Sequence, residues 1–410
     1  MSWFAKSGSS TDALHGCVLS SFPNMFSYRT NWRLSTNRFT QTLEELRRAG
    51  TPLLDLTVSN PTQCGLQYDT QAILSAFQDP QALSYDPQPK GLLSAREAVA
   101  RYYLDDHRIA VDPESVFLTT STSEAYSFIF RLLCDPLDEV LVPKPSYPLF
   151  DFLAELQDVA LIPYWLRYTQ GWIVDFQSIE QALTDRTRAI LLVHPNNPTG
   201  SYLRPEEMER LNAIWRDRQI ALIVDEVFLD YPFDSAARKS FAGNQEVLTF
   251  TLSGLSKISA LPQMKVAWLA CTGPNELVQG AVDRLEVIAD TYLSLNAPTQ
   301  FAIPTLFAQR HSMQKQLLER VGKNRTELAS QLSAKKACEL LESEGGWYAV
   351  LRIPVDQSDE ERAIKLIREQ RVVVHPGHFF DFPKDGFLVV SLITPLAEFR
   401  EGMRRLLVSF

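Results

Sequence analysis

Residues 189–200 read AILLVHPNNPTG, and this stretch decides the fold because an apolar run rich in branched side chains ends in a tight-turn sequence. A short apolar run bounded by turn residues is typical of a strand buried on both faces. Comparable runs alternate with helical patterns through the middle of the chain, which predicts an α/β fold with a mostly parallel seven-stranded sheet between helices. The predicted strands are 116–120, 139–143, 160–164, 189–194, 221–225, 247–252 and 265–270, and the clearest helices between them are 123–133 and 205–218.

The pattern changes near residue 298, where a long helical stretch over 299–333 leads to strand patterns near 346–352, 372–375 and 387–392. A chain of 410 residues is also too long for one ordinary core. We predict a large domain over 55–298 and a smaller α/β domain built from 25–54 and 299–410. Residues 1–24 are expected to form a poorly ordered tail outside the fold.

Composition excludes several classes of protein. The formal net charge of −9 argues against a nucleic-acid partner, because affinity for a phosphate backbone depends on clustered Lys and Arg. The five cysteines are scattered and never form a C-x-x-C pair, which favours a reducing, cytoplasmic location over a disulfide framework. There is no apolar run long enough to span a bilayer, and no histidine or cysteine spacing predicts a metal site.

Four polar motifs follow predicted strands. Each has an ordinary structural explanation: a strand-end cap, a surface lysine, a tight turn and a helix N-cap. However, loops after parallel strands meet at one edge of a sheet, and a helix start rich in hydroxyl groups can seat an anion. The residues concerned are Asp225 at the end of 221–225, Lys257 in SGLSK (253–257), Asn197 in NNPTG (196–200), and Ser121, Thr122 and Ser123 in TTSTSEA (119–125).

In this order the motifs resemble those of the fold-type-I pyridoxal-phosphate aminotransferases, the aspartate-aminotransferase superfamily. That family shows a phosphate-binding loop, an aromatic residue after a proline, then N-P-T-G, D-x-x-Y and S-x-x-K. Tyr147, in PSYP (145–148), supplies the aromatic residue. The resemblance runs from about residue 53 to the C-terminus, and the segments SNP (59–61) and KGLLSAR (90–96) are similar to bacterial alanine aminotransferases.

The resemblance implies a role for each matching residue. Lys257 would hold pyridoxal 5'-phosphate as a Schiff base and carry a proton between substrate and cofactor. Asp225 would pair with the ring nitrogen, Asn197 would donate to the ring's phenolate oxygen, and Tyr147 would stack on the ring. Further implied contacts are Ser121, Thr122, Ser123 and Ser256 with the phosphate, and Asn60 and Asn197 with the substrate.

Tyr85 matches a family tyrosine that reaches the phosphate of the neighbouring subunit. This match implies a homodimer with its active sites at the interface. A buried loop aromatic is an equally weighted alternative for Tyr85.

The chain departs from the family pattern at cofactor positions. Phe228 stands where D-x-x-Y has tyrosine, so the lysine-bound cofactor is expected to keep its proton to higher pH than usual, because a hydrogen bond to a charged oxygen is missing. Lys265 replaces an arginine that contacts the phosphate, and a lysine lacks the bidentate fork of arginine. Gly254 replaces a serine, so Ser253 or Ser256 must supply any hydroxyl there.

A further departure concerns the substrate. Val389 replaces the arginine that binds the substrate α-carboxylate in the family motif R-x-S. A carboxylate in a dry site needs a partner, so another cation must take over, or the substrate lacks a normally placed carboxylate. Among Arg29, Arg33 and Arg352 we favour Arg29.

The leading hypothesis is an aminotransferase that moves an amino group between an amino acid or amine and a 2-oxo acid. A lyase or synthase on the same scaffold is one alternative, and a non-catalytic ligand-sensing relative is another. A dehydrogenase is disfavoured because no G-x-G-x-x-G follows a predicted strand.

Overall fold

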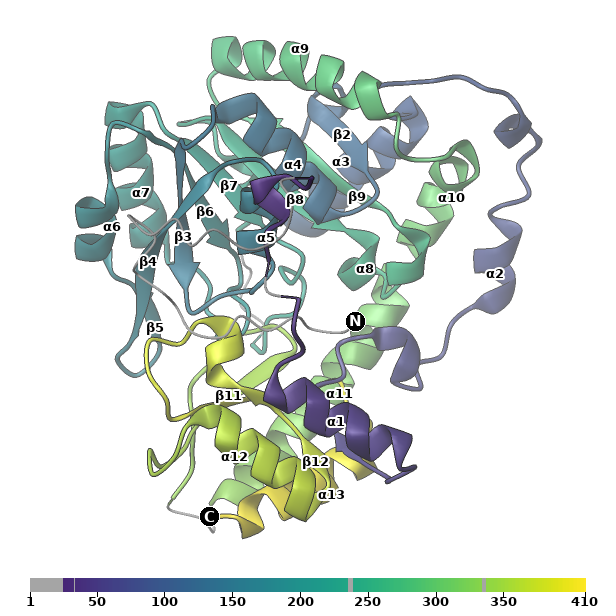
Figure 1. Cartoon of the computed structure of the whole chain (residues 1–410). Coiled ribbons are helices and arrows are strands. Elements are labelled where there is room, and N and C mark those ends of the chain that lie inside the picture. Colours follow the sequence, from purple (N-terminus) through teal and green to yellow (C-terminus); the bar gives the residue numbers. More distant parts are fainter. Residues whose placement is uncertain (1–24, 33, 235–238, 334–336) are drawn as a thin grey trace.

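The computed structural model describes residues 25–32, 34–234, 239–333 and 337–410. The predicted tail 1–24 and Arg33 therefore lie outside the described residues. Figure 1 shows an upper body around a large sheet and a lower body around a smaller one. None of the helices in the described part of the chain is both long and apolar enough to cross a membrane.

The large sheet has eight strands in the order β2-β9-β8-β7-β6-β3-β4-β5. All pairs from β8 to β4 are parallel, whereas β9 and β5 run antiparallel to their neighbours. The predicted α/β fold with a mostly parallel sheet is confirmed, and β5 is an additional edge strand. The strands are β2 (Val116–Thr119), β3 (Glu139–Lys144), β4 (Ala160–Tyr168), β5 (Trp172–Val174), β6 (Thr187–Val193), β7 (Ala221–Asp225), β8 (Thr249–Gly254) and β9 (Ala267–Thr272).

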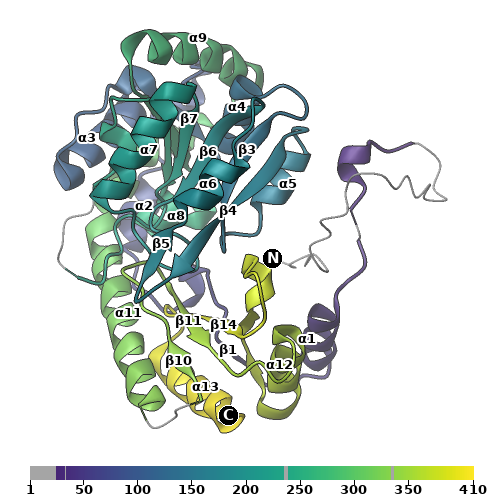
Figure 2. The ribbon, with the colours of Figure 1, turned by 90° about the vertical axis from the view of Figure 1, so that its left-hand side faces the viewer.

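Helices cover both faces of this sheet because its strands are apolar on both sides. On β7, Ala221 and Ile223 pack in the core under α4, α5 and α9, whereas Leu222 and Val224 pack under α6 and α7. Figure 2 shows the sheet between α6 and α7 on one side and α4 and α5 on the other. The helices are α3 (Leu93–His107), α4 (Thr122–Leu133), α5 (Phe150–Glu155), α6 (Phe176–Ala182), α7 (Pro205–Arg218), α8 (Leu255–Ile258) and α9 (Asn275–Tyr292).

The smaller sheet has the antiparallel order β10-β11-β14-β13, and β1 pairs separately with β12. The strand patterns near 346–352, 372–375 and 387–392 all lie in this region. Its strands are β1 (Leu54–Asp55), β10 (Glu339–Leu340), β11 (Tyr348–Arg352), β12 (Val372–Val373), β13 (His375–Pro376) and β14 (Phe387–Ser391), with helices α1 (Arg38–Arg48), α12 (Asp359–Lys365) and α13 (Leu396–Val408) around them.

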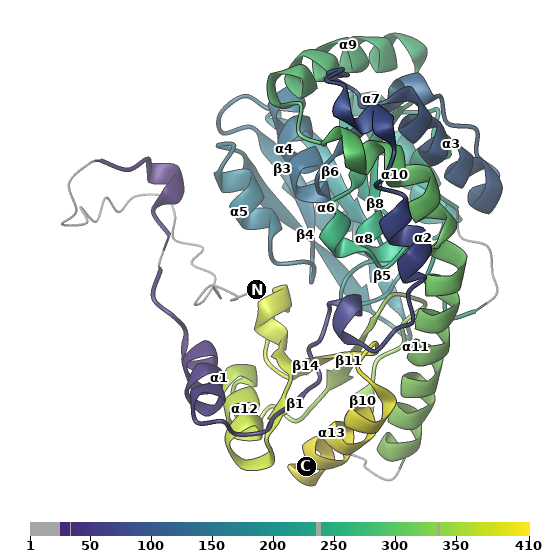
Figure 3. The same ribbon diagram turned by 90° about the vertical axis from the view of Figure 1, so that its right-hand side faces the viewer.

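The helical stretch predicted over 299–333 is two helices, α10 (Ala297–Ala308) and α11 (Arg310–Leu332), which meet at Gln309. Figure 3 shows α10 beside the large sheet and α11 continuing down to the small one. The domain boundary near residue 298 stays a prediction. The remaining elements are α2 (Thr70–Ser75), the 3-10 helices η1 (Tyr28–Thr30), η2 (Pro61–Gln63), η3 (Pro80–Leu83), η4 (Pro113–Ser115), η5 (Phe241–Gly243), η6 (Pro262–Met264) and η8 (Gly377–Phe380), and the π-helix η7 (Leu366–Gln370).

Candidate functional site

The candidate site forms where the parallel strands end. Strands β2, β3, β6, β7 and β8 run in one direction, so the segments that follow them meet at the same edge of the sheet. The polar motifs singled out in the sequence all lie on these segments: Ser121–Ser123 after β2, Tyr147 after β3, Asn197 after β6, Asp225 at the end of β7 and Lys257 after β8.

Asp225 is a buried carboxylate with a hydrogen bond on each oxygen. Its Oδ2 accepts a hydrogen bond from the hydroxyl of Tyr126 on α4 at 2.9 Å, and its Oδ1 accepts one from the backbone N–H of Val227 at 3.1 Å. Burial raises the pKa of Asp225 to about 6, against the opposing effects of these two donors and of the Lys257 charge. The carboxylate is therefore held in place but is poorly neutralised by its surroundings.

Lys257 lies on the one-turn helix α8, and its amine faces aromatic rings. The Nζ atom is 4.9 Å from the ring centre of Trp347 and 5.5 Å from that of Phe228. Burial lowers the pKa of Lys257 to about 8, although the charge of Asp225 favours the protonated form. A neutral amine is consequently accessible near neutral pH, as a nucleophile or a proton acceptor requires.

Gly254, which replaces the expected serine, has a steric explanation. Its backbone passes so close to β9 that a Cβ atom would lie 2.8 Å from the carbonyl oxygen of Val266. Close packing of the two strands thus excludes a side chain at this position. Ser256 is half-buried on α8, whereas the side chain of Lys265 is exposed beyond η6.

Asn197 and Tyr147 are joined through the neighbouring Asn196. The Asn196 Nδ2 donates to the carbonyl oxygen of Pro145 at 3.1 Å, which links the segment after β6 to the segment after β3. The Oδ1 of Asn197 is buried and makes no hydrogen bond within the described residues. Burial raises the pKa of Tyr147, and Tyr348 and the charge of Asp225 raise it further. We call Asp225, Lys257, Asn197 and Tyr147 the front group.

The hydroxyl-rich segment after β2 forms the start of α4. Ser121 is the N-cap, and its Oγ accepts a hydrogen bond from the backbone N–H of Glu124 at 3.2 Å. The Glu124 carboxylate in turn accepts from the N–H of Thr120 at 2.8 Å and from Ser294 Oγ at 2.6 Å. Thr122 begins the helix, so the first-turn N–H groups point toward the strand edge and can bind an anion.

The side chain of Phe228 packs edge-on against Trp347, with 5.2 Å between ring centres. One turn later, Tyr231 donates a hydrogen bond to the carbonyl oxygen of Lys257 at 2.6 Å. The hydroxyl of Tyr231 therefore holds the backbone of Lys257 and not its side-chain amine.

Other predicted residues do not join the front group within one chain. Arg29 pairs with Asp158 at 2.8 Å, and Figures 2 and 3 show η1 well apart from α8. The side chain of Tyr85 is 85% exposed. Arg352, another candidate cation, pairs with Glu339 at 2.8 Å.

Asn60 and Val389 have local structural roles. The Oδ1 of Asn60 caps η2 by accepting from the N–H of Thr62 at 3.1 Å. Val389 is fully buried in the middle of β14, with His375 and Val350 as its partners on the adjacent strands. A valine here completes the apolar core of the small sheet.

Sequence reasoning missed two residues of the site, Tyr126 and Trp347. Both occupy positions whose apolar surroundings predict an ordinary core aromatic. Only the three-dimensional contacts with Asp225 and Lys257 reveal their connection to the site.

A second polar cluster lies behind the front group, on the other face of the sheet. Successive strand residues point to opposite faces, so Glu226 points away from Asp225. Its carboxylate accepts from Ser240 Oγ and from the N–H of Phe241, each at 2.6 Å. Burial raises the pKa of Glu226 to about 7.

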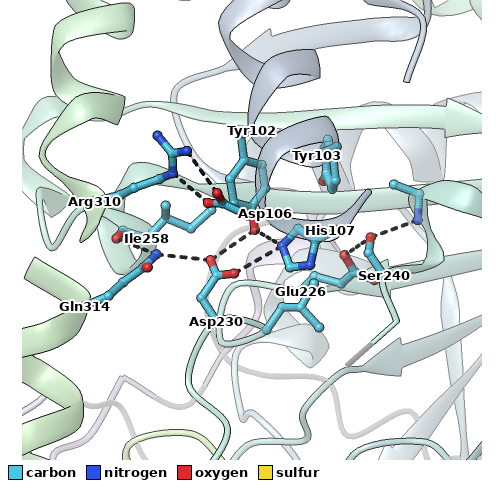
Figure 4. Close-up of polar contacts among 12 residues, drawn as sticks. Tyr102, Tyr103, Asp106, His107, Glu226, Asp230, Ser240, Ile258, Arg310 and Gln314 are labelled. Atoms are coloured by element: carbon cyan, nitrogen blue, oxygen red, sulfur yellow. Dashed lines mark hydrogen bonds and ion pairs between the residues drawn. The ribbon is translucent and has the colours of Figure 1, made fainter. Parts of the chain in front are cut away.

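Asp230 is the centre of this cluster (Figure 4). Its Oδ1 lies 3.1 Å from His107 Nε2, and its Oδ2 accepts from the hydroxyl of Tyr102 at 3.0 Å. Gln314 donates both to Asp230 and to the carbonyl oxygen of Ile258, next to Lys257. Burial lowers the pKa of His107, but Asp230 outweighs that effect, so the pKa lies above its ordinary value. We call Tyr102, His107, Glu226, Asp230 and Gln314 the rear network.

Comparisons with known proteins agree on one family. The family model "Aminotransferase class I and II" matches residues 51–406. The glutamate-pyruvate aminotransferase AlaA of Haemophilus influenzae is 27% identical over 88% of this chain and 93% of its own length. An alanine aminotransferase of Mycobacterium tuberculosis is 29% identical over 89% of this chain and 88% of its own.

Solved structures match the fold. An aminotransferase from Escherichia coli superposes with a TM-score of 0.83 at 24% identity, covering 94% of this chain and 97% of its own. An alanine aminotransferase from Pyrococcus furiosus gives a TM-score of 0.82 at 23% identity, covering 90% and 94%.

Proposed function

This chain belongs to the class I and II aminotransferases, a family that uses pyridoxal phosphate, and we propose that its front group holds this cofactor through Lys257. The aminotransferase predicted from the sequence is thereby confirmed at the level of the family. The observation that carries the proposal is that a lysine amine and a buried carboxylate lie at the carboxyl ends of the neighbouring strands β8 and β7, close enough for each charge to affect the pKa of the other group.

The polar atoms of the front group fit the cofactor. The buried Oδ1 of Asn197 has no hydrogen-bond partner in the described chain, so it can accept a hydrogen bond from a ligand, while the Nδ2 group of the same amide is the proposed donor to the cofactor. The start of α4, with Ser121, Thr122 and Ser123, suits a phosphate. Ser256 and Lys265 flank the same edge and are the further proposed phosphate contacts.

Lys257 is the proposed proton carrier. Bound pyridoxal phosphate supplies an electron sink for the electron pair that remains when the substrate Cα loses its proton. The Lys257 amine, once displaced by the substrate amino group, would take this proton from Cα and would deliver it to the C4′ atom of the cofactor. Because the amine is tethered beside the reacting atoms, the transfer is effectively intramolecular. The rings of Phe228 and Trp347 lie beside the amine.

Asp225 is the proposed partner of the ring nitrogen. An opposite charge in contact favours the protonated form of that nitrogen. Tyr147 would cover one face of the ring, and Asn197 would donate to its phenolate oxygen. Together these residues would fix the orientation of the cofactor relative to Lys257.

The proposed substrates are an amino acid or amine and a 2-oxo acid. The names of the similar proteins make alanine, glutamate and their 2-oxo acids the first compounds to test. Asn60 and Asn197 stay the proposed polar contacts for the substrate. Within a single chain Arg29 is not proposed as a substrate contact, because its guanidinium group pairs with Asp158.

A homodimer is the proposed assembly. Leu83 and Tyr85 are 92% and 85% exposed and lie two residues apart, so they offer apolar surface to a second copy. They border a hollow of about 370 Å³ between the segment 82–91 and the segment 293–300. A second copy would cover this surface, and Tyr85 would then reach the phosphate of its partner. The cysteines of the described residues form no disulfide, which suits the proposed cytoplasmic location.

Borohydride reduction of the holoenzyme followed by peptide mapping tests the attachment. A phosphopyridoxyl group on Lys257 is the expected result, and one on another lysine would overturn the proposal. A panel of amino donors then tests the reaction. Stoichiometric 2-oxo acid without ammonia supports transamination, whereas ammonia release supports a lyase and no reaction supports a ligand sensor.

A further inference from the structure

The hydroxyl of Tyr126 makes the one side-chain hydrogen bond to Asp225 found within the described residues. Tyr126 is 2% exposed and projects from α4, 99 residues away from Asp225 in the sequence. A buried phenol needs a partner, and its donor is directed at a carboxylate that the proposed chemistry requires.

Packed rings fix the position of this phenol. The ring of Tyr126 packs edge-on against Phe150, with 5.3 Å between ring centres. Phe150 packs edge-on against Tyr147, with 5.8 Å between ring centres. The centre of the Tyr126 ring also lies 6.1 Å from that of Phe130. The hydroxyl therefore has little freedom to turn away from Asp225.

The charges around Asp225 make this donor important. The groups that face the carboxylate are Tyr126 from α4, Lys257 from α8 and Tyr147 from the segment after β3. Burial opposes the ionised form of Asp225, and the Tyr126 hydroxyl favours it. Glu226, the adjacent carboxylate, points to the opposite face. Without the hydroxyl, the carboxylate would keep only one backbone donor and the Lys257 charge.

We propose that Tyr126 is a positioning residue, whose hydroxyl orients the Asp225 carboxylate and maintains its negative charge for the cofactor's ring nitrogen. This inference rests on the proposed function of Lys257 and Asp225. It assigns to α4 a second role besides its N-terminal phosphate seat. A purely structural role would require only the ring.

The substitution Tyr126→Phe separates these roles, because it keeps the ring and removes the hydroxyl. Tyr164→Phe is a matched control: Tyr164 is 1% exposed and donates to the carbonyl oxygen of Leu191 at 3.0 Å, away from the front group. Fluorescence titration of each apoprotein with pyridoxal phosphate between pH 5 and pH 9 would measure binding. Thermal unfolding of the same proteins would measure their stability.

In Tyr126→Phe the dissociation constant for pyridoxal phosphate should rise about tenfold at neutral pH, because a hydrogen bond to a charged group is lost. The pH at which binding strengthens should also move upward, since Asp225 ionises less readily. Tyr164→Phe should leave both quantities at the wild-type values. Identical binding and pH profiles for the two variants would overturn the role of Tyr126. Failure of the wild-type protein to bind pyridoxal phosphate would instead overturn the proposed function.

Discussion

The two polar groups at the end of β7 differ in how fully their atoms are paired. In the rear network, the carboxylates of Asp230 and Glu226 each accept at least two hydrogen bonds from neighbouring donors. In the front group, the buried Oδ1 of Asn197 accepts no hydrogen bond from the described residues, and the amine of Lys257 lies over two aromatic rings. Asp225 of the front group accepts two hydrogen bonds, as Glu226 of the rear network does, so the contrast between the two groups comes from Asn197 and Lys257.

This difference indicates which of the two groups has hydrogen-bonding capacity for a ligand. A buried polar atom without a partner lowers stability, so a fold retains it only where something else compensates. The rear network satisfies its own groups and holds α3, the end of β7 and α11 together. Within the described residues the front group leaves the Asn197 oxygen unused, which supports the proposal that a ligand binds on that side.

The largest expected effect follows from removing the amine of the front group. In Lys257→Met, kcat/KM should fall at least about 10³-fold, because both the attachment point and the proton carrier are lost. The free energy of unfolding of the apoprotein should stay equal or rise, since a buried amine is replaced by an apolar chain of similar length. Steady-state kinetics and urea unfolding measure the two quantities. A stable variant with wild-type turnover would contradict the assignment of Lys257.

For the rear network we expect a loss of stability with little loss of turnover. In Asp230→Ala, the free energy of unfolding should fall by about 3 kcal/mol, because His107 and Tyr102 lose a buried partner. Turnover per folded holoenzyme should remain within about twofold of wild type. Asp230→Asn, which keeps an acceptor for Tyr102, serves as the milder control. A large loss of turnover without a loss of stability would show that the rear network takes part in the chemistry.

Local patterns predicted that the residues of the front group follow strands, and the resemblance to the aminotransferases predicted their roles. Asp225, Lys257 and Asn197 each follow an apolar run, and parallel strands bring such positions to one edge. The rear network could not be predicted in this way. Its members come from α3, the segment after β7 and α11, and local patterns do not determine which buried side chains meet.

The fold shows the same limit. Most strands of the large sheet were predicted to within about two residues, but β4 continues four residues beyond its predicted end, and β5 was missed because it has three residues and lies at the sheet edge. The break at Gln309 was missed as well, since the residues on both sides of it favour helix. The exposed Arg29 was favoured as a substrate contact only because local sequence cannot show its pairing with Asp158.

The pH dependence of stability tests whether Glu226 of the rear network is protonated in the folded protein. Burial raises the pKa of Glu226 from its ordinary value of 4.5 to about 7 in the folded protein. The protonated form therefore stabilises the fold fully below pH 4.5, and this contribution is lost as the pH rises through 7. Relative to Glu226→Gln, the wild-type apoprotein should lose about 2 to 3 kcal/mol between these limits.

Urea unfolding of both proteins from pH 4.5 to pH 8.5 measures this difference, and Lys257 and Asp225 contribute equally to each. The glutamine keeps an acceptor for Phe241, so the substitution removes the titration with little change in packing. Parallel stability curves for the two proteins would mean that Glu226 stays charged in the fold.

The smallest expected effect concerns the hydroxyl absent from the front side. Phe228→Tyr would restore the tyrosine of the family motif D-x-x-Y, whose hydroxyl would donate to the cofactor's phenolate oxygen, and should lower the pH of the bound cofactor's visible spectral transition by about one unit. The direction follows because a hydrogen bond to the deprotonated oxygen favours loss of the proton. Phe228→Leu, which removes the ring without adding a donor, should leave the transition where it is in wild type. If both variants moved the transition equally, packing against Trp347 rather than the missing hydroxyl would set the protonation of the bound cofactor.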